Sequence, residues 1–196
     1  MRNLETPTYK LLVYGGDSSL GSAILAEALH RQFEATAVLD DLNEQRARPG
    51  LRAKSGGLSD PIEVSRSVAG MHGVICLLEV ALKDQDDFAL RFNTLIALLD
   101  GLETAGVKRL MVVDDFTWLD RDLAPESPVH HLTDRLKAST VAWTLVQAPP
   151  SSDEDLGIDD FKQPGASALP LHRFAMAVLD ELDLALHHHQ RLQIDL

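Results

Sequence analysis

Apolar residues along the chain follow two periods, one typical of buried strands and the other of amphipathic helices. Continuous apolar runs of four to six residues, bounded by glycine, proline or polar clusters, predict strands. They occupy residues 9–14, 35–39, 73–78, 109–113 and 141–146, a weaker pattern at residues 51–54 predicts a further strand, and the C-terminal RLQIDL predicts a closing edge strand.

The segments between these runs have the spacing of helices that bury one face. Asp60 and Pro61 form a helix start, with an N-cap followed by a first-turn proline. Gly106 marks a helix end. The inner faces are Leu20, Ile24, Leu25, Ala28 and Leu29; Phe88, Phe92, Leu95, Leu99 and Leu102; Leu132, Leu136 and Ala138; and Leu171, Phe174, Ala175, Val178 and Leu182.

Strands and helices therefore alternate from one end of the chain to the other. Such alternation is typical of βαβ units and a parallel sheet. The sequence predicts one α/β domain over residues 1–196, a Rossmann-type doubly wound fold with a mainly parallel sheet. Residues 148–167 carry five carboxylates and no period, and they are expected to form a loop near the strand ends.

Composition limits the partners. The net charge is −12 and the basic residues form no stripe, which disfavours nucleic acid. No apolar run reaches the roughly 20 residues of a membrane span, and the first ten residues lack the apolar stretch of a signal peptide. Cys76, the single cysteine, lies in an apolar run and suits a reducing compartment. We expect a cytoplasmic protein with no membrane partner.

The strongest motif is YGGDSSLG, between the first strand and the first helix. Helix N-terminal amides at such a turn bind a pyrophosphate, and glycines let backbone and phosphate approach. The turn predicts a dinucleotide site made of Gly15, Gly16, Asp17, Ser18, Ser19, Leu20 and Gly21. The alternative is a tight turn with no ligand.

Further landmarks extend this motif to nearly the whole chain. GGLSDPIEVSRSVAGMHGVI, AGVKRLMVV and LKASTVAWTLVQAPP come after it in that order. With the glycine turn, they resemble the NmrA-like atypical short-chain dehydrogenases, a group that includes flavin and biliverdin-IXβ reductases. The resemblance implies NAD or NADP as cofactor and a reductase-type activity.

The sequence departs from that group at positions expected to face the ligand. Ser18 replaces the middle glycine of the turn, and Gly57, beside Leu58, stands where the group has an aspartate near the adenine. Asp114 and Asp115 occupy the place of a serine or threonine near the nicotinamide. The Tyr-x-x-x-Lys pair of typical short-chain dehydrogenases is absent, which excludes proton transfer by that route.

Two carboxylates follow the second strand at the position that contacts the adenosine ribose. Asp40 and Asp41 would accept hydrogen bonds from the ribose hydroxyls and so favour NAD over NADP. Arg46 and Arg48 lie close enough in sequence to weaken that preference. The alternative is a helix cap in a solvated acidic turn.

Candidate catalytic groups are few. Asp114 and Asp115 could share a proton and act as a general acid, although successive strand residues face opposite ways and the two then form no pair. His131, beside His130, could donate a proton, or both could be surface residues. His187, His188 and His189 lack metal-ligand spacing and are expected to end the last helix, so no metal site is predicted.

Two functions remain open. One is an NAD(P)-dependent oxidoreductase of the flavin- or quinone-reductase kind, in which positioning of cofactor and substrate does the chemical work. The other is a catalytically inactive dinucleotide sensor or a module that binds a regulatory protein. In this second function the protein could also bind no cofactor at all. A homodimer is a further expectation, and the substrate is undetermined.

Overall fold

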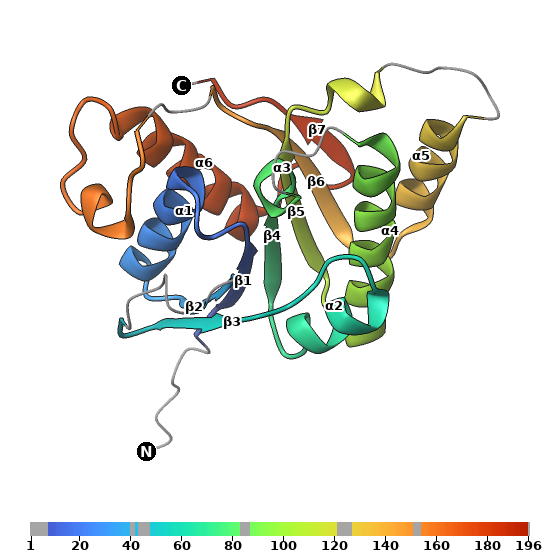
Figure 1. Ribbon diagram of the computed structural model, residues 1–196, viewed down its shortest axis with the longest axis horizontal. Coiled ribbons are helices and arrows are strands. Elements are labelled where there is room, and N and C mark those ends of the chain that lie inside the picture. The colour runs from blue at the N-terminus through green and yellow to red at the C-terminus, as the bar shows by residue number, and fades with distance from the viewer. Residues whose placement is uncertain are drawn as a thin grey trace.

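The computed structural model describes residues 8–39, 42, 48–82, 87–120, 127–150 and 154–195. Seven parallel strands form one sheet in the order β3-β2-β1-β4-β5-β6-β7 (Figure 1). The strands are β1 (Lys10–Tyr14), β2 (Glu34–Val38), β3 (Leu51–Lys54), β4 (Gly73–Leu77), β5 (Arg109–Asp114), β6 (Ala142–Gln147) and β7 (Gln190–Leu192).

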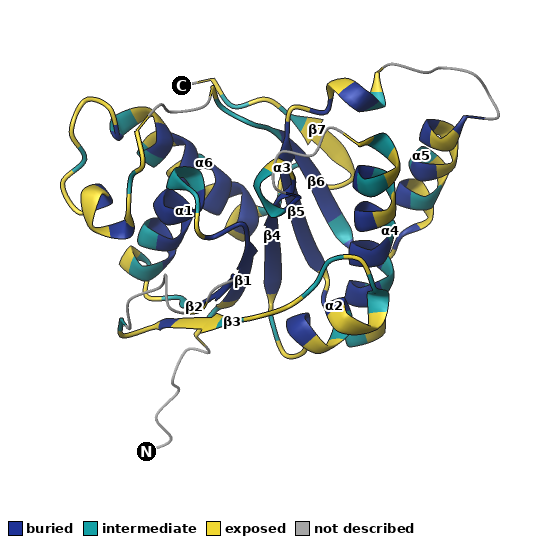
Figure 2. Cartoon of the chain, in the orientation of Figure 1, coloured by how far each residue is buried: buried dark blue, intermediate teal, exposed yellow. Residues whose placement is uncertain are grey.

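Helices cover both faces of this sheet. On one face lie α1 (Ser19–His30), the 3-10 helix η2 (Ile158–Phe161) and α6 (Leu169–Leu184). On the other lie α2 (Pro61–Val68), α4 (Phe88–Ala105) and α5 (Pro128–Ala138). The short α3 (Leu78–Ala81) follows β4, and the 3-10 helix η1 (Thr117–Leu119) follows β5. The central strands are buried on both sides (Figure 2).

The predicted doubly wound Rossmann fold is therefore confirmed, and the strand order reverses between β1 and β4. Ligands of open parallel sheets bind at this reversal, outside the carboxyl ends of the strands. Asp60 caps α2 through its contact with the Ile62 amide, and Gly106 ends α4 at φ +73°, as the sequence predicts. No helix among the described residues is long and apolar enough to span a bilayer.

Two local predictions need correction. Residues 148–167 are not wholly irregular, because Ile158–Phe161 form η2, whose Ile158 and Phe161 are buried against the α1 side of the core. The histidines 187–189 do not end the last helix. That helix stops at Leu184, after which Ala185 adopts φ +50°, and His189 donates its amide to Trp143 O on the way into β7.

The connection from β6 to β7 has an unusual hand. From β4 to β7 the chain moves in one direction across the sheet, and α4 and α5 lie on the same face. The helix α6 lies on the opposite face, beside α1. Since parallel crossovers are right-handed in nearly all cases, this last one is left-handed.

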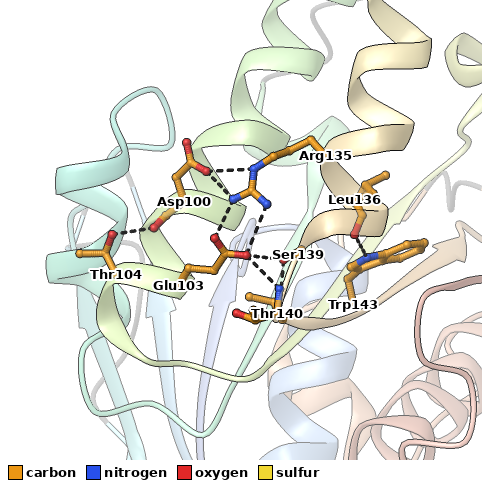
Figure 3. A network of polar contacts seen from close by, with 9 residues as sticks. Asp100, Glu103, Thr104, Arg135, Leu136, Ser139, Thr140 and Trp143 are labelled. Carbon is orange, nitrogen blue, oxygen red and sulfur yellow. Dashed lines mark hydrogen bonds and ion pairs between the residues drawn. The ribbon is translucent and has the colours of Figure 1, made fainter.

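A polar network at the amino end of β6 joins α4 to α5 (Figure 3). Arg135 on α5 binds Asp100 at 2.5 Å and Glu103 at 2.8 Å on α4. Glu103 also accepts hydrogen bonds from the Ser139 hydroxyl and the Thr140 amide. These contacts lie at the amino ends of the strands, whereas the glycine turn lies at the carboxyl ends. They hold α4 and α5 together without touching the turn.

Candidate functional site

The glycine turn joins the carboxyl end of β1 to α1. Gly15 has φ +78°, a left-handed conformation that a side chain disfavours. A Cβ on Gly21 would collide with the Gly15 carbonyl and lie 2.7 Å from Gly16 Cα. Glycine at both positions therefore lets α1 begin directly against the turn, with its first amides at the strand ends.

The Ser18 hydroxyl is used inside the turn. It accepts a hydrogen bond from the Gly21 amide at 3.0 Å and donates one to the Gly15 carbonyl at 3.0 Å. Ser18 is thus the N-cap of α1, with an extended backbone. The serine that replaces the middle glycine keeps the turn closed.

Ser19, the first residue of α1, holds a distant part of the chain. Its hydroxyl donates to the Glu154 carbonyl at 2.9 Å and accepts from the Leu156 amide at 2.9 Å. We call residues 154–160, which follow β6 and include four carboxylates, the acidic segment. The two bonds place the acidic segment beside the N-terminus of α1, at the left of Figure 1.

A cleft of about 560 Å³ opens between the turn, the end of β2 and the acidic segment. The turn contributes Gly16 and Asp17, β2 is followed by Leu39, and the acidic segment contributes residues 155–160. Among the described residues that line the cleft, Arg48 is the one basic residue. The cleft therefore combines a helix N-terminus, which favours anions, with a strongly acidic wall, which opposes them.

Arg48 is already paired. Its guanidinium makes a two-pronged ion pair with Asp159, with Nη1 and Nη2 at 2.8 and 2.6 Å from the two carboxylate oxygens. Lys162 binds the same carboxylate at 2.8 Å. The hydrogen bond from Arg48, and to a smaller extent that from Lys162, holds the pKa of Asp159 well below its usual range. Asp159 thus stays ionised at any physiological pH.

A smaller cavity of about 150 Å³ lies on the other side of the turn. Gly15, Asp17, Gly57 and Leu58 line it, so the structure brings these candidate residues together. A Cβ on Gly57 would collide with Glu63 Oε2, from α2. A carboxylate is therefore present beside Gly57, but Glu63 supplies it, which spacing within the motif did not indicate.

Asp114 and Asp115 do not face each other, as the alternation of strand residues predicts. Asp114 is buried on the α4 face, where Arg91 Nη1 contacts both of its oxygens at 2.6 and 2.7 Å and Trp118 Nε1 donates to Oδ2 at 2.7 Å. Asp115 is exposed and accepts from the amide and hydroxyl of Thr117. Asp114 is enclosed by its partners and cannot reach a substrate.

The remaining candidates lie apart or outside the described residues. His130 and His131 are exposed on α5, across the sheet from α1. Asp40, Asp41 and Arg46 fall outside the residues that the structure describes. Within those residues, no group of histidine, cysteine, aspartate or glutamate side chains could hold a metal ion.

Both tyrosines are removed from proton chemistry. Tyr14, at the carboxyl end of β1, is buried in the core, and Tyr9, just before β1, is partly buried against it. Burial, reinforced by the charge of Asp183, raises the pKa of Tyr9 to about 12. Burial likewise raises the pKa of Tyr14. Neither phenol is poised to exchange a proton near neutral pH.

Comparison with known proteins agrees with this geometry. The model of a family described as NAD(P)H-binding matches residues 15–167, which include the turn, the strands β2 to β6 and the acidic segment. No curated protein sequence matches the chain significantly.

Solved structures share the same architecture. A proposed epimerase from Bacteroides thetaiotaomicron is 20% identical with a TM-score of 0.67, over 95% of this chain and 96% of that one. The Bordetella bronchiseptica enzyme WbmH, in complex with NAD+, is 15% identical with a TM-score of 0.67, over 96% and 76%. A Veillonella parvula short-chain dehydrogenase/reductase, in complex with NADP, is 13% identical with a TM-score of 0.63, over 95% and 94%. At these identities the likeness establishes the fold alone.

Proposed function

Because the chain belongs to the NAD(P)H-binding family, we propose that it binds a reduced nicotinamide dinucleotide across the glycine turn and transfers hydride to a flavin- or quinone-type acceptor. The observation that carries the proposal is the turn itself. Gly15 and Gly21 allow the first amides of α1 to meet a pyrophosphate, and the Ser18 hydroxyl is turned inward.

The choice of acceptor follows from the side chains at the strand ends. Asp114 is enclosed by Arg91 and Trp118, Tyr14 is buried, and Tyr9 lies at the opposite end of β1. A carbonyl substrate needs a positioned proton donor to complete its reduction. Flavins and quinones accept hydride first and can then take a proton from water, so positioning alone can serve them.

For this binding mode, the charges around the turn favour NADH over NADPH. Asp17 is exposed beside the turn and lines both cavities, where it would repel a 2′-phosphate. Arg48 is engaged by Asp159 and so is poorly available to such a phosphate.

A second candidate function is a dinucleotide sensor without turnover. The enclosed Arg91–Asp114 pair favours it, because Asp114 stands where the resemblance to the NmrA-like group implies a serine or threonine near the nicotinamide. The two functions share the cofactor site and differ only in whether the bound dinucleotide gives up its hydride.

One experiment separates them. The purified protein is titrated with NADH and with NADPH by calorimetry, and NADH oxidation is then followed at 340 nm with FMN or a benzoquinone. Micromolar NADH binding with turnover supports the reductase, and binding without turnover supports the sensor. If neither NADH nor NADPH binds at millimolar concentration, the reductase and the sensor are both rejected.

The Asp17→Asn variant tests where the dinucleotide lies. Removing a negative charge beside the pyrophosphate should tighten NADH binding by about two- to fivefold, and NADPH binding at least as much. Asp134→Asn, at an exposed position on α5, is the matched control and should leave both affinities unchanged. Equal affinities in wild type and Asp17→Asn would place the ligand elsewhere.

A further inference from the structure

The cleft beside the glycine turn is lined by Leu39, which follows β2, and by Arg48, which precedes β3. In Rossmann-type folds the adenosine ribose lies at the end of the second strand, and an arginine nearby accommodates the 2′-phosphate that distinguishes NADP from NAD. The Leu51 amide donates to the Arg48 carbonyl at 3.2 Å and anchors this residue to the start of β3. Of the described residues that line the cleft, Arg48 alone is basic, so a 2′-phosphate there has one cation to bind.

Asp159 binds this arginine with the geometry that a phosphate would use. Two nitrogens of the Arg48 guanidinium meet the two oxygens of the carboxylate, at 2.8 and 2.6 Å. Arginine binds carboxylates and phosphates through the same pair of parallel hydrogen bonds. Asp159 belongs to η2, in which Ile158 and Phe161 are buried. An anchored turn of helix therefore holds the carboxylate on the guanidinium.

The other charges around the cleft are arranged differently. Its described lining holds three more carboxylates, those of Asp17, Asp155 and Asp160. Asp160 accepts a hydrogen bond from the Gly157 amide at 2.8 Å, within its own segment. Lys162 binds Asp159 at 2.8 Å but does not line the cleft. Neutralising Asp160 would remove one negative charge from the wall and leave Arg48 occupied, whereas neutralising Asp159 would release the guanidinium.

We propose that Asp159 determines the preference for NADH, because it occupies the arginine that would otherwise bind the 2′-phosphate of NADPH. The inference rests on the proposed binding of a dinucleotide across the glycine turn, and it assigns the choice of cofactor to a residue beyond β6. The ribose of NADH brings two hydroxyls to this part of the cleft and leaves the ion pair intact. NADPH brings a phosphate of roughly two negative charges, which Asp159 repels.

The test compares the affinities of NADH and NADPH for the wild-type protein and for Asp159→Asn, by calorimetry and without any acceptor. We expect the affinity for NADPH, relative to that for NADH, to rise at least about fivefold in Asp159→Asn. The reason is that the released guanidinium can make charge-assisted hydrogen bonds to the 2′-phosphate. Asp159→Glu keeps the charge and should keep the wild-type ratio. Asp159→Ser provides a second neutral residue at the position.

Two further variants separate the guanidinium from a general loss of negative charge. Asp160→Asn neutralises a carboxylate of the same wall, and its side-chain oxygen can still accept the Gly157 amide. Its affinity ratio should stay within about twofold of the wild-type ratio. In the double variant Asp159→Asn with Arg48→Gln, the gain in NADPH affinity should disappear. Melting temperatures check that each variant is folded.

The outcomes distinguish this inference from the proposed function. An unchanged ratio in folded Asp159→Asn, with NADH still bound, would overturn the role of Asp159 and leave dinucleotide binding standing. An equal rise of the ratio in Asp160→Asn would overturn it too, because the charge of the wall would then explain the preference. If neither dinucleotide binds to any of these proteins, the proposed function fails and the role of Asp159 fails with it.

Discussion

The Asp114 carboxylate receives three hydrogen bonds from two side chains and has no exposed side-chain surface. Removing one partner from such a buried pair leaves an uncompensated charge, which typically costs about 3 to 5 kcal/mol. The pair is therefore a structural element of the strand end, and its two members depend on each other.

We expect Arg91→Met to lower the free energy of unfolding by roughly 3 kcal/mol or more, measured by urea denaturation. The double variant Arg91→Met with Asp114→Leu should recover much of that loss, since no charge is left buried. Asp115→Asn, at the exposed neighbour, is the control and should change stability by less than about 1 kcal/mol. Equal losses in the single and double variants would contradict this account.

The two tyrosines give a pH prediction. The pKa of Tyr9 is raised to about 12 and that of Tyr14 is raised as well, whereas an unfolded tyrosine ionises near pH 10. The folded state thus holds protons that the unfolded state releases. The resulting stabilisation is complete below about pH 10 and is lost as the pH rises through about 12.

Absorbance at 295 nm measures this directly, because Tyr9 and Tyr14 are the only tyrosines in the chain. At about pH 10.5 the native protein should show almost no tyrosinate, and the protein in guanidinium should show most of two. Early tyrosinate in the native protein would mean that at least one phenol is accessible.

The sequence predicted residues of the turn more easily than residues of the buried pair. Gly15 and Gly21 are recognisable because they are local to one strand and one helix. Arg91 is separated from Asp114 by 23 positions, and only its own helix gave a signal. It lies on the buried face of α4, in register with Leu95 and Leu98, where a charge requires a partner. That signal was missed.

Among the elements, α1 and the acidic segment are joined by one hydroxyl. Ser19 bonds the backbone of Glu154 and Leu156 across 135 and 137 positions of sequence, so no local pattern could indicate the contact. The strands and helices themselves were predicted because each follows its own period. The placement of the segment beside the turn depends on tertiary contacts.

Ser19→Ala should release the acidic segment while leaving α1 in place. Hydrogen exchange of residues 154–160 should become at least about tenfold faster, since two hydrogen bonds of about 1 kcal/mol each are lost. Ser65→Ala, whose hydroxyl bonds only the Ile62 carbonyl within α2, is the control. Unchanged exchange in the segment would show that other contacts hold it.

At the scale of the whole molecule, two hydrophobic cores share one sheet. Trp118 and Trp143 belong to the core on the α4 face, and Phe174 to the core on the α1 face. The central strands contribute side chains to both cores, so neither should persist alone. The sequence-based expectation of a single domain therefore stands as a prediction of one cooperative transition.

Tryptophan fluorescence tests it from both faces. The native tryptophans report on the α4 face, and a variant with Trp118→Phe, Trp143→Phe and Phe174→Trp reports on the α1 face. In each protein the fluorescence and far-ultraviolet circular dichroism midpoints in urea should coincide. Separate midpoints in one protein would indicate two units.

The left-handed β6–β7 crossover constrains how the cleft competes for ligands. The chain leaving β6 must pass to the α1 face to reach α6, so it brings the acidic segment to the face of the sheet on which α1 and the cleft lie, where Ser19 holds it. Because Asp159 belongs to the same chain as Arg48, its carboxylate acts as an intramolecular competitor for the guanidinium, and such competitors can act at effective concentrations on the order of millimolar. A dissolved anion that binds Arg48 must displace the Asp159 carboxylate. The crossover therefore sets a minimum affinity for Arg48, and anions that bind more weakly are excluded.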